Sequence, residues 1–341
     1  MIVKTVPINS SGKNILITGA NSGIGFFSVI NFLRKKNYLF IPLKSISRKE
    51  DFIKKLNNYF NIDYIKNYIK IIDNVDFSDL KNLEKIKEYL SRETINLDII
   101  ILNAGLQYTG SLYPKVSKQG VELTFAVNHL AHFYLLNIVL PFLKDYEGSK
   151  IIITSSDVHD PNSSGGNIGK RANLNNFKNF KEEIMGNYLG FNADKAYKNS
   201  KLCNILFGKE LSNRLQIKKS KISVISWAPG LVIPNDGNGF FRYSKKFNQF
   251  GYFLFSKLAK DILGISESVE DAGKLLFEIA IDGDLNQIKY IHLSNKLVNF
   301  RKHKLVQSNV SKEANNKQLA KRLWQLSEEL CSLFLSSPTN F

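Results

Sequence analysis

A tyrosine and a lysine stand four positions apart in the segment KAYKNSKLCN, as Tyr197 and Lys201. On a helix this spacing places both side chains on one face. A free tyrosine has a pKa near ~10, and we expect the ammonium group of Lys201 to lower the pKa of Tyr197. The pair therefore predicts a general acid and base for proton transfer, although such a pair alone is more often a solvated helix face.

Two further polar residues could complete a proton-transfer site. Ser156 follows the apolar run SKIIITSS, so we expect it at the end of a strand, where its hydroxyl could hydrogen-bond a substrate carbonyl. Asn128 lies within a long predicted helix and could hold a water that relays protons to Lys201.

A glycine-rich turn comes earlier in the chain, between a predicted strand and a predicted helix. Its residues are Thr18, Gly19, Ala20, Asn21, Ser22, Gly23, Ile24 and Gly25. Glycines at this spacing allow positive φ and close backbone approach to a pyrophosphate, and the helix N-terminus supplies amide donors. The turn therefore predicts dinucleotide binding, with a tight structural turn as the alternative.

The ends of the next strands indicate which dinucleotide would bind. Lys44 and Arg48 follow the second predicted strand, where basic side chains favour the 2′-phosphate and hence NADP(H). A solvated surface is the alternative in a chain so rich in lysine. Asp76, followed by Phe77, could accept a hydrogen bond from the adenine amino group. The fourth strand is expected to end against the cofactor at Asn103, Ala104 and Gly105.

Alternating strands and helices predict an α/β fold, a Rossmann-type doubly wound parallel sheet with helices on both faces. The expected strands cover 13–18, 37–43, 68–77, 97–105, 149–156 and 221–230, and 120–144 is expected to be one long helix. We expect a single domain over 1–341. Three segments depart from the alternation: an insertion at 157–194 before the catalytic helix, a lid-like or membrane-surface segment at 234–262, and a C-terminal helical extension at 296–341.

Composition limits the classes of protein. Hydrophobic residues make up 43% of the chain, which excludes a disordered protein, and no secretory signal is recognisable, so we expect a cytoplasmic location. The net charge of +17 is spread along the chain without a nucleic-acid-binding motif, so we expect no nucleic acid partner. An anionic membrane surface is a further candidate partner, with coding bias as the alternative source of the lysines. The sequence does not specify an oligomeric state.

Metal chemistry is not expected from this sequence. His129 and His132 are three positions apart, and we interpret them as helix-packing residues rather than zinc ligands. Cys203 and Cys331 are interpreted as reduced thiols.

These motifs together, with Pro229-Gly230 after the last predicted strand, resemble the short-chain dehydrogenase/reductase family over residues 13 to 233. Within it, the segments NHLAHF, GNIGKRANL, KAYKNSKLCN and SKEANNKQLAKRLWQLSEEL are similar to those of the light-dependent protochlorophyllide reductases. Retinol-dehydrogenase-like members share part of this layout. The long separation between Ser156 and Tyr197 also fits the pigment enzymes.

The resemblance implies a role for each matched residue. Tyr197 would donate a proton and NADPH a hydride across a double bond of a bound pigment, in a step driven by light, while Lys201 would hold the nicotinamide ribose. Pro229 and Gly230 would lie at the cofactor. Cys203 matches a family cysteine beside the catalytic helix and would contact the substrate, with a small buried helix residue as the alternative. Leu231, the second residue expected at the substrate, stands where the pigment enzymes have a cysteine.

Three functions follow as hypotheses. The first is an NADPH-dependent reductase of the protochlorophyllide reductase type, acting on that pigment or another hydrophobic conjugated substrate. The second is a retinol-dehydrogenase-like carbonyl/alcohol oxidoreductase. The third is a non-catalytic NADP- or pigment-binding protein.

Overall fold

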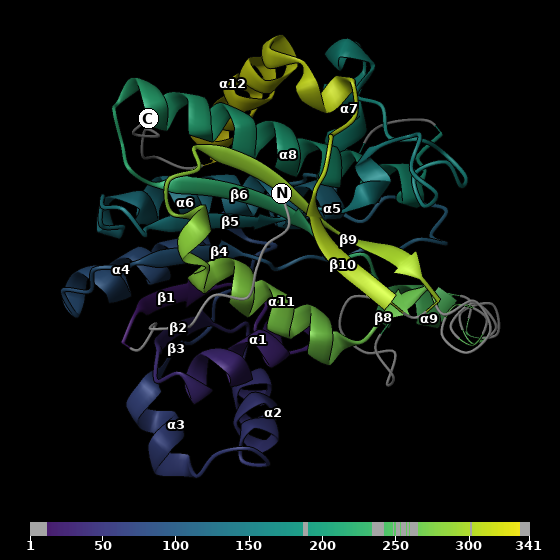
Figure 1. Cartoon of the computed structure of the whole chain (residues 1–341). Helices are drawn as coiled ribbons and strands as arrows, with labels where there is room; N and C mark the ends of the chain where they lie inside the picture. The colour runs from purple at the N-terminus through teal and green to yellow at the C-terminus, as the bar shows by residue number, and fades with distance from the viewer. Residues whose placement is uncertain are drawn as a thin grey trace.

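The computed structural model describes residues 12–186, 190–233, 242–247, 249, 253, 257, 259, 265–300 and 302–334. Its centre is an eight-stranded sheet with the order β3-β2-β1-β4-β5-β6-β9-β10 (Figure 1). The strands are β1 (Asn14–Ile17), β2 (Tyr38–Pro42), β3 (Ile69–Ile72), β4 (Ile99–Leu102), β5 (Lys150–Thr154), β6 (Ser223–Ala228), β9 (Tyr290–Asn299) and β10 (Lys302–Gln307). Their pairings are parallel except that of β9 with β10.

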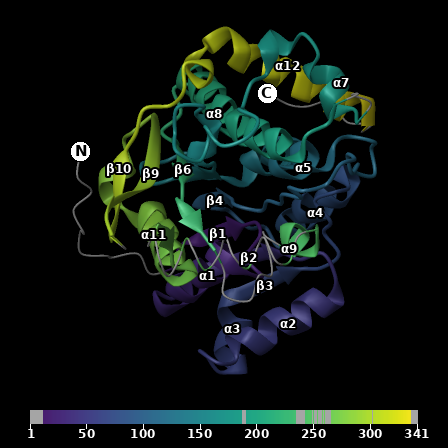
Figure 2. The same ribbon diagram turned by 90° about the vertical axis from the view of Figure 1, so that its right-hand side faces the viewer.

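Helices cover both faces of the sheet because both faces are apolar. Side chains alternate between the faces along a strand. Ile15 and Ile17 therefore belong to one core cluster, and Leu16 to the other. The first cluster contains α1 (Gly23–Arg34), α2 (Ile46–Leu56), α3 (Ile62–Tyr68) and α11 (Val269–Ile281). The second contains α4 (Glu84–Arg92), α6 (Ala131–Val139), α8 (Ala193–Ile217) and α12 (Lys317–Phe334), and Figure 2 shows α12 over α8. The predicted doubly wound fold is confirmed.

The predicted helix over 120–144 is interrupted. It consists of α5 (Leu123–Phe125), a π-helical turn η2 (Ala126–Leu130), α6, and a short 3-10 turn (Leu140–Phe142). Among the described residues, the stretch Leu123–Phe142 is long and apolar enough to cross a bilayer, but 89% of its apolar window is buried inside the fold. It is therefore placed as a core element.

The segments predicted to depart from the alternation have different outcomes. The insertion 157–194 contains short turns and α7 (Phe180–Ile184). The lid-like segment 234–262 lies mostly outside the described residues, which include its helix α9 (Arg242–Phe247). The C-terminal extension 296–341 contains the expected helix, α12, and begins in the β9–β10 hairpin, which was not predicted. Two short strands, β7 (Leu231–Val232) and β8 (Ser266–Glu267), pair beside the main sheet.

Candidate active site

The predicted site residues meet at the carboxyl ends of neighbouring strands. The strand order reverses between β1 and β4, and ligands of doubly wound sheets bind at such a switch point. The glycine turn follows β1, Gly105 follows β4 and Ser156 follows β5. One edge of the sheet therefore brings the predicted dinucleotide and proton-transfer residues together.

The glycine turn has the geometry that a pyrophosphate requires. Gly19 has a φ of +69°, and a Cβ on it would lie 2.7 Å from the Cα of Ala104. A Cβ on Gly25 would lie 2.3 Å from the carbonyl oxygen of Gly19. Gly23, with a φ of +55°, has no atom within 4 Å of the Cβ position, so the space beside it is open. Ser22 begins α1 without a side-chain cap, which leaves the helix amides for a ligand.

Thr18 joins the glycine turn to the end of β4. Its Oγ1 accepts hydrogen bonds from the amides of Asn103 (2.8 Å) and Ala104 (2.9 Å). It also lies 3.0 Å from Nε2 of His132, whose Nδ1 lies 3.1 Å from the carbonyl oxygen of Asn128. Burial lowers the pKa of His132 to about 4, so the imidazole is neutral near physiological pH. The bonds are all satisfied if Nδ1–H donates to Asn128 and the Thr18 hydroxyl donates to Nε2.

Asn128 has a positioning role in this structure. Its Oδ1 accepts from the amide of Leu106 (2.8 Å), and its Nδ2 donates to the carbonyl of Leu106 (2.9 Å) and to Oγ of Ser200 (3.0 Å). These bonds fix the chain after Gly105 against α8. The amide predicted to hold a relay water is thus bonded to protein groups, which favours a structural task over the relay.

Tyr197, Lys201 and Ser156, the predicted proton-transfer residues, lie close together in the structure. Ser156 hydrogen-bonds the Tyr197 phenol with its side chain. Lys201 is 3% exposed, and its Nζ lies 5.7 Å from the centre of the Tyr197 ring. The same Nζ donates to the carbonyl of Thr154 at 3.2 Å, and a Cβ on Gly105 would lie 3.8 Å from it. Burial lowers the pKa of Lys201 to about 8. The ammonium group therefore lies between the ends of β4 and β5.

The pKa of Tyr197 moves in the direction opposite to our prediction. Burial raises it above the ordinary value, the hydrogen bond from Ser156 lowers it, and the charge of Asp194 raises it. Lys201 is not among these causes. The physical reason is that the loss of hydration on partial burial disfavours the phenolate more than a cation 5.7 Å from the ring centre stabilises it. Tyr197 is therefore a protonated phenol, ready to donate.

The adenosine-side residues are at the end of the crevice nearer β2 and β3. Nζ of Lys44 forms an ion pair with Oδ2 of Asp76 at 2.8 Å, and Arg48 is exposed in the first turn of α2. Burial raises the pKa of Asp76, but hydrogen bonds from Lys44 and Ser78 lower it below its ordinary value overall. The ring of Phe77 packs against His132 with 5.5 Å between centroids. Lys44 and Asp76 are thus positioned together, a pairing that the sequence did not predict.

The four remaining predicted residues have different surroundings. Pro229 and Gly230 follow β6, and Gly230 has a φ of +80°. Leu231 is partly exposed in β7. Cys203 is completely buried in the core beneath α8, and burial raises the pKa of its thiol. Complete burial favours the alternative for Cys203, a small buried helix residue, over the expected substrate contact.

The helix that carries Tyr197 also holds the insertion. Nζ of Lys198 donates to the carbonyls of Ile168 and Lys170, the latter at 3.1 Å, and forms an ion pair with Asp194 at 2.8 Å. Asn199 accepts from the amide of Asn173 at 2.8 Å.

The C-terminal extension holds the insertion from its other side. Glu313 accepts from the amide of Leu174 at 2.8 Å, and Arg322 donates to the carbonyl of Asn176 at 2.9 Å. The insertion is thus fixed between α8 and the C-terminal segment.

Two site residues were missed from the sequence. His132 was considered only as a packing residue or zinc ligand, yet its position four residues after Asn128 could have indicated a bond to that carbonyl. Thr154 accepts from Nε1 of Trp227 at 3.0 Å and donates to Oδ1 of Asn103 at 3.2 Å. Its carbonyl binds Lys201, a backbone contact that no sequence pattern reveals. The second histidine, His129, bonds Ser327 of α12 and serves packing.

Comparison with known proteins agrees with this geometry. The chain is 27% identical to the chloroplastic protochlorophyllide reductase of Pisum sativum, over 94% of this chain and 78% of the relative. It is 28% identical to retinol dehydrogenase 11 of Homo sapiens, over 97% of this chain and 89% of the relative. L-Sorbose reductase from Gluconobacter frateurii, solved in complex with NADPH and L-sorbose, has the same fold, with a TM-score of 0.62. It is 15% identical, and the match covers 86% of this chain and 98% of that chain.

The family described as short chain dehydrogenase matches residues 13–166. This range contains the glycine turn, the residues Asn103 to Gly105, and Ser156, which the structure assembles at one edge of the sheet beside Tyr197 and Lys201. Over residues 13–166 the chain is thus similar to short-chain dehydrogenases, and over most of its length it is similar to the protochlorophyllide reductase and the retinol dehydrogenase named above.

Proposed function

We propose that this protein is an NADPH-dependent reductase that delivers a hydride and a proton across a double bond of a hydrophobic conjugated substrate. One observation carries the proposal. A partly buried, protonated phenol, Tyr197, is hydrogen-bonded to Ser156 and lies beside Lys201, at the sheet edge that bears the glycine turn. Such a phenol is a proton donor, as a reduction requires.

The glycine turn and the adenosine-side residues fit NADP(H). The open space at Gly23 and the free helix start suit a pyrophosphate, and Lys44 and Arg48 are the cations for a 2′-phosphate. The L-sorbose reductase of the same fold was solved with NADPH, which supports the assignment. When bound, the cofactor supplies the hydride.

The chain's own residues have three tasks in this reaction. Tyr197 gives its phenolic proton to the substrate atom that becomes electron-rich when the hydride adds to its neighbour. Ser156 hydrogen-bonds the phenol and so stabilises the phenolate that remains. Lys201, when protonated, provides a positive charge that opposes the new negative charge, and its bond to Thr154 fixes the ammonium group.

The surroundings of the site favour an apolar substrate. The chain after Gly105 enters a small cluster in which Tyr108 stacks on Phe191 with 5.9 Å between centroids and meets Tyr243 of α9 edge-on. Relatives named protochlorophyllide reductase support a conjugated pigment, and hence chlorophyll biosynthesis and photosynthesis. Leu231, in place of the cysteine of those enzymes, adds an apolar side chain beyond the Pro229-Gly230 turn.

A spectroscopic experiment separates this proposal from its alternatives. Purified protein is mixed with NADPH and protochlorophyllide, and absorption is recorded before and after a light flash. We expect a red-shifted complex and its conversion by light. Turnover of retinal in the dark, without pigment binding or conversion, would establish the retinol-dehydrogenase-like function instead.

The Tyr197→Phe variant tests the role of the phenol. We expect turnover to fall by a factor of about 10² or more, while the affinity for NADPH stays within about twofold. Unchanged turnover would show that Tyr197 is not the proton donor. Absence of turnover in the wild type with every substrate, together with intact NADPH binding, would favour a non-catalytic binding protein.

We also propose peripheral contact with an anionic membrane. The tip of the β9–β10 hairpin exposes Leu297, Val298 and Phe300, by 41%, 47% and 62%, between exposed lysines. Apolar side chains flanked by cations suit a membrane surface. Flotation with anionic vesicles should retain the protein at low salt and release it at high salt. The proposal fails if anionic vesicles bind no more protein than neutral ones.

A further inference from the structure

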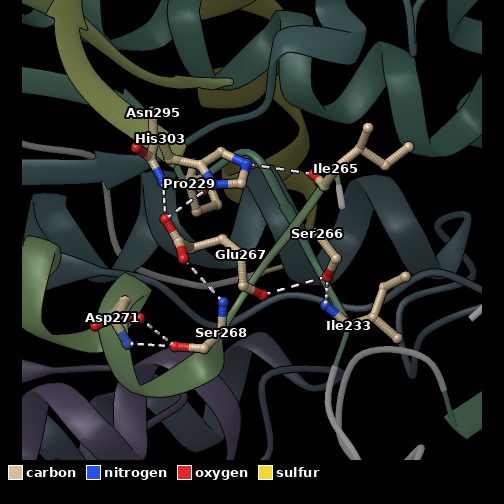
Figure 3. A network of polar contacts seen from close by, with 9 residues as sticks. All are labelled: Pro229, Ile233, Ile265, Ser266, Glu267, Ser268, Asp271, Asn295 and His303. Carbon is tan, nitrogen blue, oxygen red and sulfur yellow. Dashed lines mark hydrogen bonds and ion pairs between the residues drawn. The ribbon is translucent and has the colours of Figure 1, made fainter. Parts of the chain in front are cut away.

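A second polar network lies behind the Pro229-Gly230 turn, away from the residues discussed above (Figure 3). It joins elements that are far apart in the sequence. Glu267 ends β8, Asn295 lies in β9 and His303 lies in β10. We propose that Asn295 and Glu267 are positioning residues that set the Pro229-Gly230 turn against the nicotinamide end of the crevice. This inference rests on the proposed function, because that function places a nicotinamide there.

Asn295 makes the direct contacts with the turn. Its Nδ2 donates to the carbonyl of Pro229 at 3.3 Å, and its side chain is buried, with 2% of the residue exposed. The next residue, Gly230, has a φ of +80°, and a Cβ on it would lie 2.8 Å from the carbonyl oxygen of Asn295. The turn is therefore in close contact with β9, and a shift of Asn295 must move it.

Glu267 fixes the orientation of Asn295. Its Oε2 accepts from Nδ2 of Asn295 at 3.1 Å and lies 3.4 Å from Nδ1 of His303. Its Oε1 accepts from the amide of Ser268 at 3.0 Å. A carboxylate can accept all these bonds, whereas a glutamine amide would set its NH₂ group against one of the donors. The site therefore specifies a carboxylate.

His303 completes the network on the far side of Glu267. Its side chain is 4% exposed, and its Nε2 lies 3.3 Å from the carbonyl oxygen of Ile265. Its two ring nitrogens thus face oxygen atoms of Glu267 and Ile265, so the imidazole connects the Glu267 carboxylate to β10.

The network also connects the turn to the dinucleotide end of the fold. Ser268 caps α11 by accepting from the amide of Asp271 at 2.9 Å. Helix α11 packs closely on α1, because a Cβ on Gly273 would lie 2.5 Å from Cβ of Phe27. Glu267 therefore links the Pro229-Gly230 turn, through Ser268 and α11, to α1, the helix that follows the glycine turn. The same residues thus support both segments that we expect to contact the cofactor.

The experiment compares two ligands. NADPH would reach the Pro229-Gly230 turn, whereas 2′,5′-ADP carries the adenosine half alone. Affinities are measured by titration calorimetry for the wild type, Asn295→Leu, Glu267→Gln and the control Lys304→Gln, an exposed lysine on β10. We expect each network variant to bind NADPH about tenfold more weakly than the wild type, while its affinity for 2′,5′-ADP stays within about twofold. The control should change neither affinity.

Two results would overturn the positioning role. One is an equal loss of both affinities in Asn295→Leu and in the nearly isosteric Glu267→Gln, which would show a general disturbance of the fold. The other is no change in either affinity. Failure of the wild type to bind NADPH at all would instead refute the proposed function.

Discussion

The hydroxyl of Thr18 and the imidazole of His132 lie 3.0 Å apart, in hydrogen-bond contact between the glycine turn and the helix that carries Asn128. The carbonyl of Asn128, which the other ring nitrogen of His132 contacts, lies in the π-helical turn η2. The same imidazole links the cofactor side and the catalytic side of the site.

Replacement of His132 by Phe should therefore weaken both folding and cofactor binding. The change takes one buried partner from the Thr18 hydroxyl, which keeps the amides of Asn103 and Ala104, and one from the Asn128 carbonyl. We expect the loss of the two bonds to lower the free energy of unfolding by about 1–3 kcal/mol. Urea denaturation measures this loss, and fluorescence titration measures NADPH affinity. His129→Phe is the matched control, because Ser327 keeps its bond to the carbonyl of Leu323. Equal effects of the two substitutions would contradict the linking role of His132.

The buried ammonium group of Lys201 should lower the free energy of unfolding at neutral pH. Its pKa is about 8 in the folded protein, against an ordinary 10.5. Between these values the unfolded chain binds the proton and the folded protein does not, so this residue makes stability rise as pH increases from about 8 to 10.5. Below pH 8 the folded protein contains a buried ammonium group, which lowers the free energy of unfolding.

Lys201→Met should remove that cost. We expect the free energy of unfolding of the variant to exceed that of the wild type by up to about 3 kcal/mol near neutral pH. The difference should disappear above the ordinary lysine pKa. The carbonyl of Thr154 keeps its bond from Asn204, at 3.1 Å. Lys221→Met, at an exposed lysine, is the control. A less stable Lys201→Met variant at neutral pH would show that the ammonium stabilises the fold.

Lys44 and Arg48 should decide between NADPH and NADH. The double variant Lys44→Ala/Arg48→Ala removes the cations proposed for the 2′-phosphate, so NADPH should bind about tenfold more weakly or worse, with NADH unaffected. Lys49→Ala is the control. Lys49 lies in the same helix as Arg48, but its ammonium group forms an ion pair with Asp73 at 2.7 Å. Calorimetric titration with both cofactors gives the ratio. An unchanged preference would assign the 2′-phosphate to other residues.

Lys198 should protect the insertion from proteolysis. Lys198→Met removes the ammonium group that holds the carbonyls of Ile168 and Lys170. Trypsin should then cleave after the exposed Lys170 and Arg171 about tenfold faster, because local opening becomes less costly. Timed digestion followed by mass spectrometry identifies the cuts. Lys181→Met, at an exposed ion pair on α7, should leave these rates unchanged.

The parallel strands could be predicted because their sequences are apolar on both faces. Runs such as the one in β4, Ile99–Leu102, are buried on both sides and bounded by turn residues, so periodicity and glycine positions define them. The hairpin of β9 and β10 was missed because its outer half is exposed and mixes lysines with apolar residues. Nothing local distinguishes such a segment from a loop.

The residues of the candidate site could be listed from the sequence, but not their electrostatics. The spacing of Tyr197 and Lys201 indicated one helix face, yet the pKa of Tyr197 depends on how much protein covers it. Burial is a tertiary property, and here it reverses the expected shift. The contacts of Asn295 with Pro229 likewise join residues whose distance in the sequence hides their proximity.

Because Glu313 and Arg322 bond the insertion that Lys198 and Asn199 hold from the other side, the loop and the chain's last helix depend on each other. A homologous chain without the C-terminal segment would leave the amide of Leu174 without its acceptor. A homologous chain without the insertion would expose the part of the C-terminal segment that contacts it. Natural selection should therefore keep or discard the two segments as a unit, and homologous chains should contain both or neither.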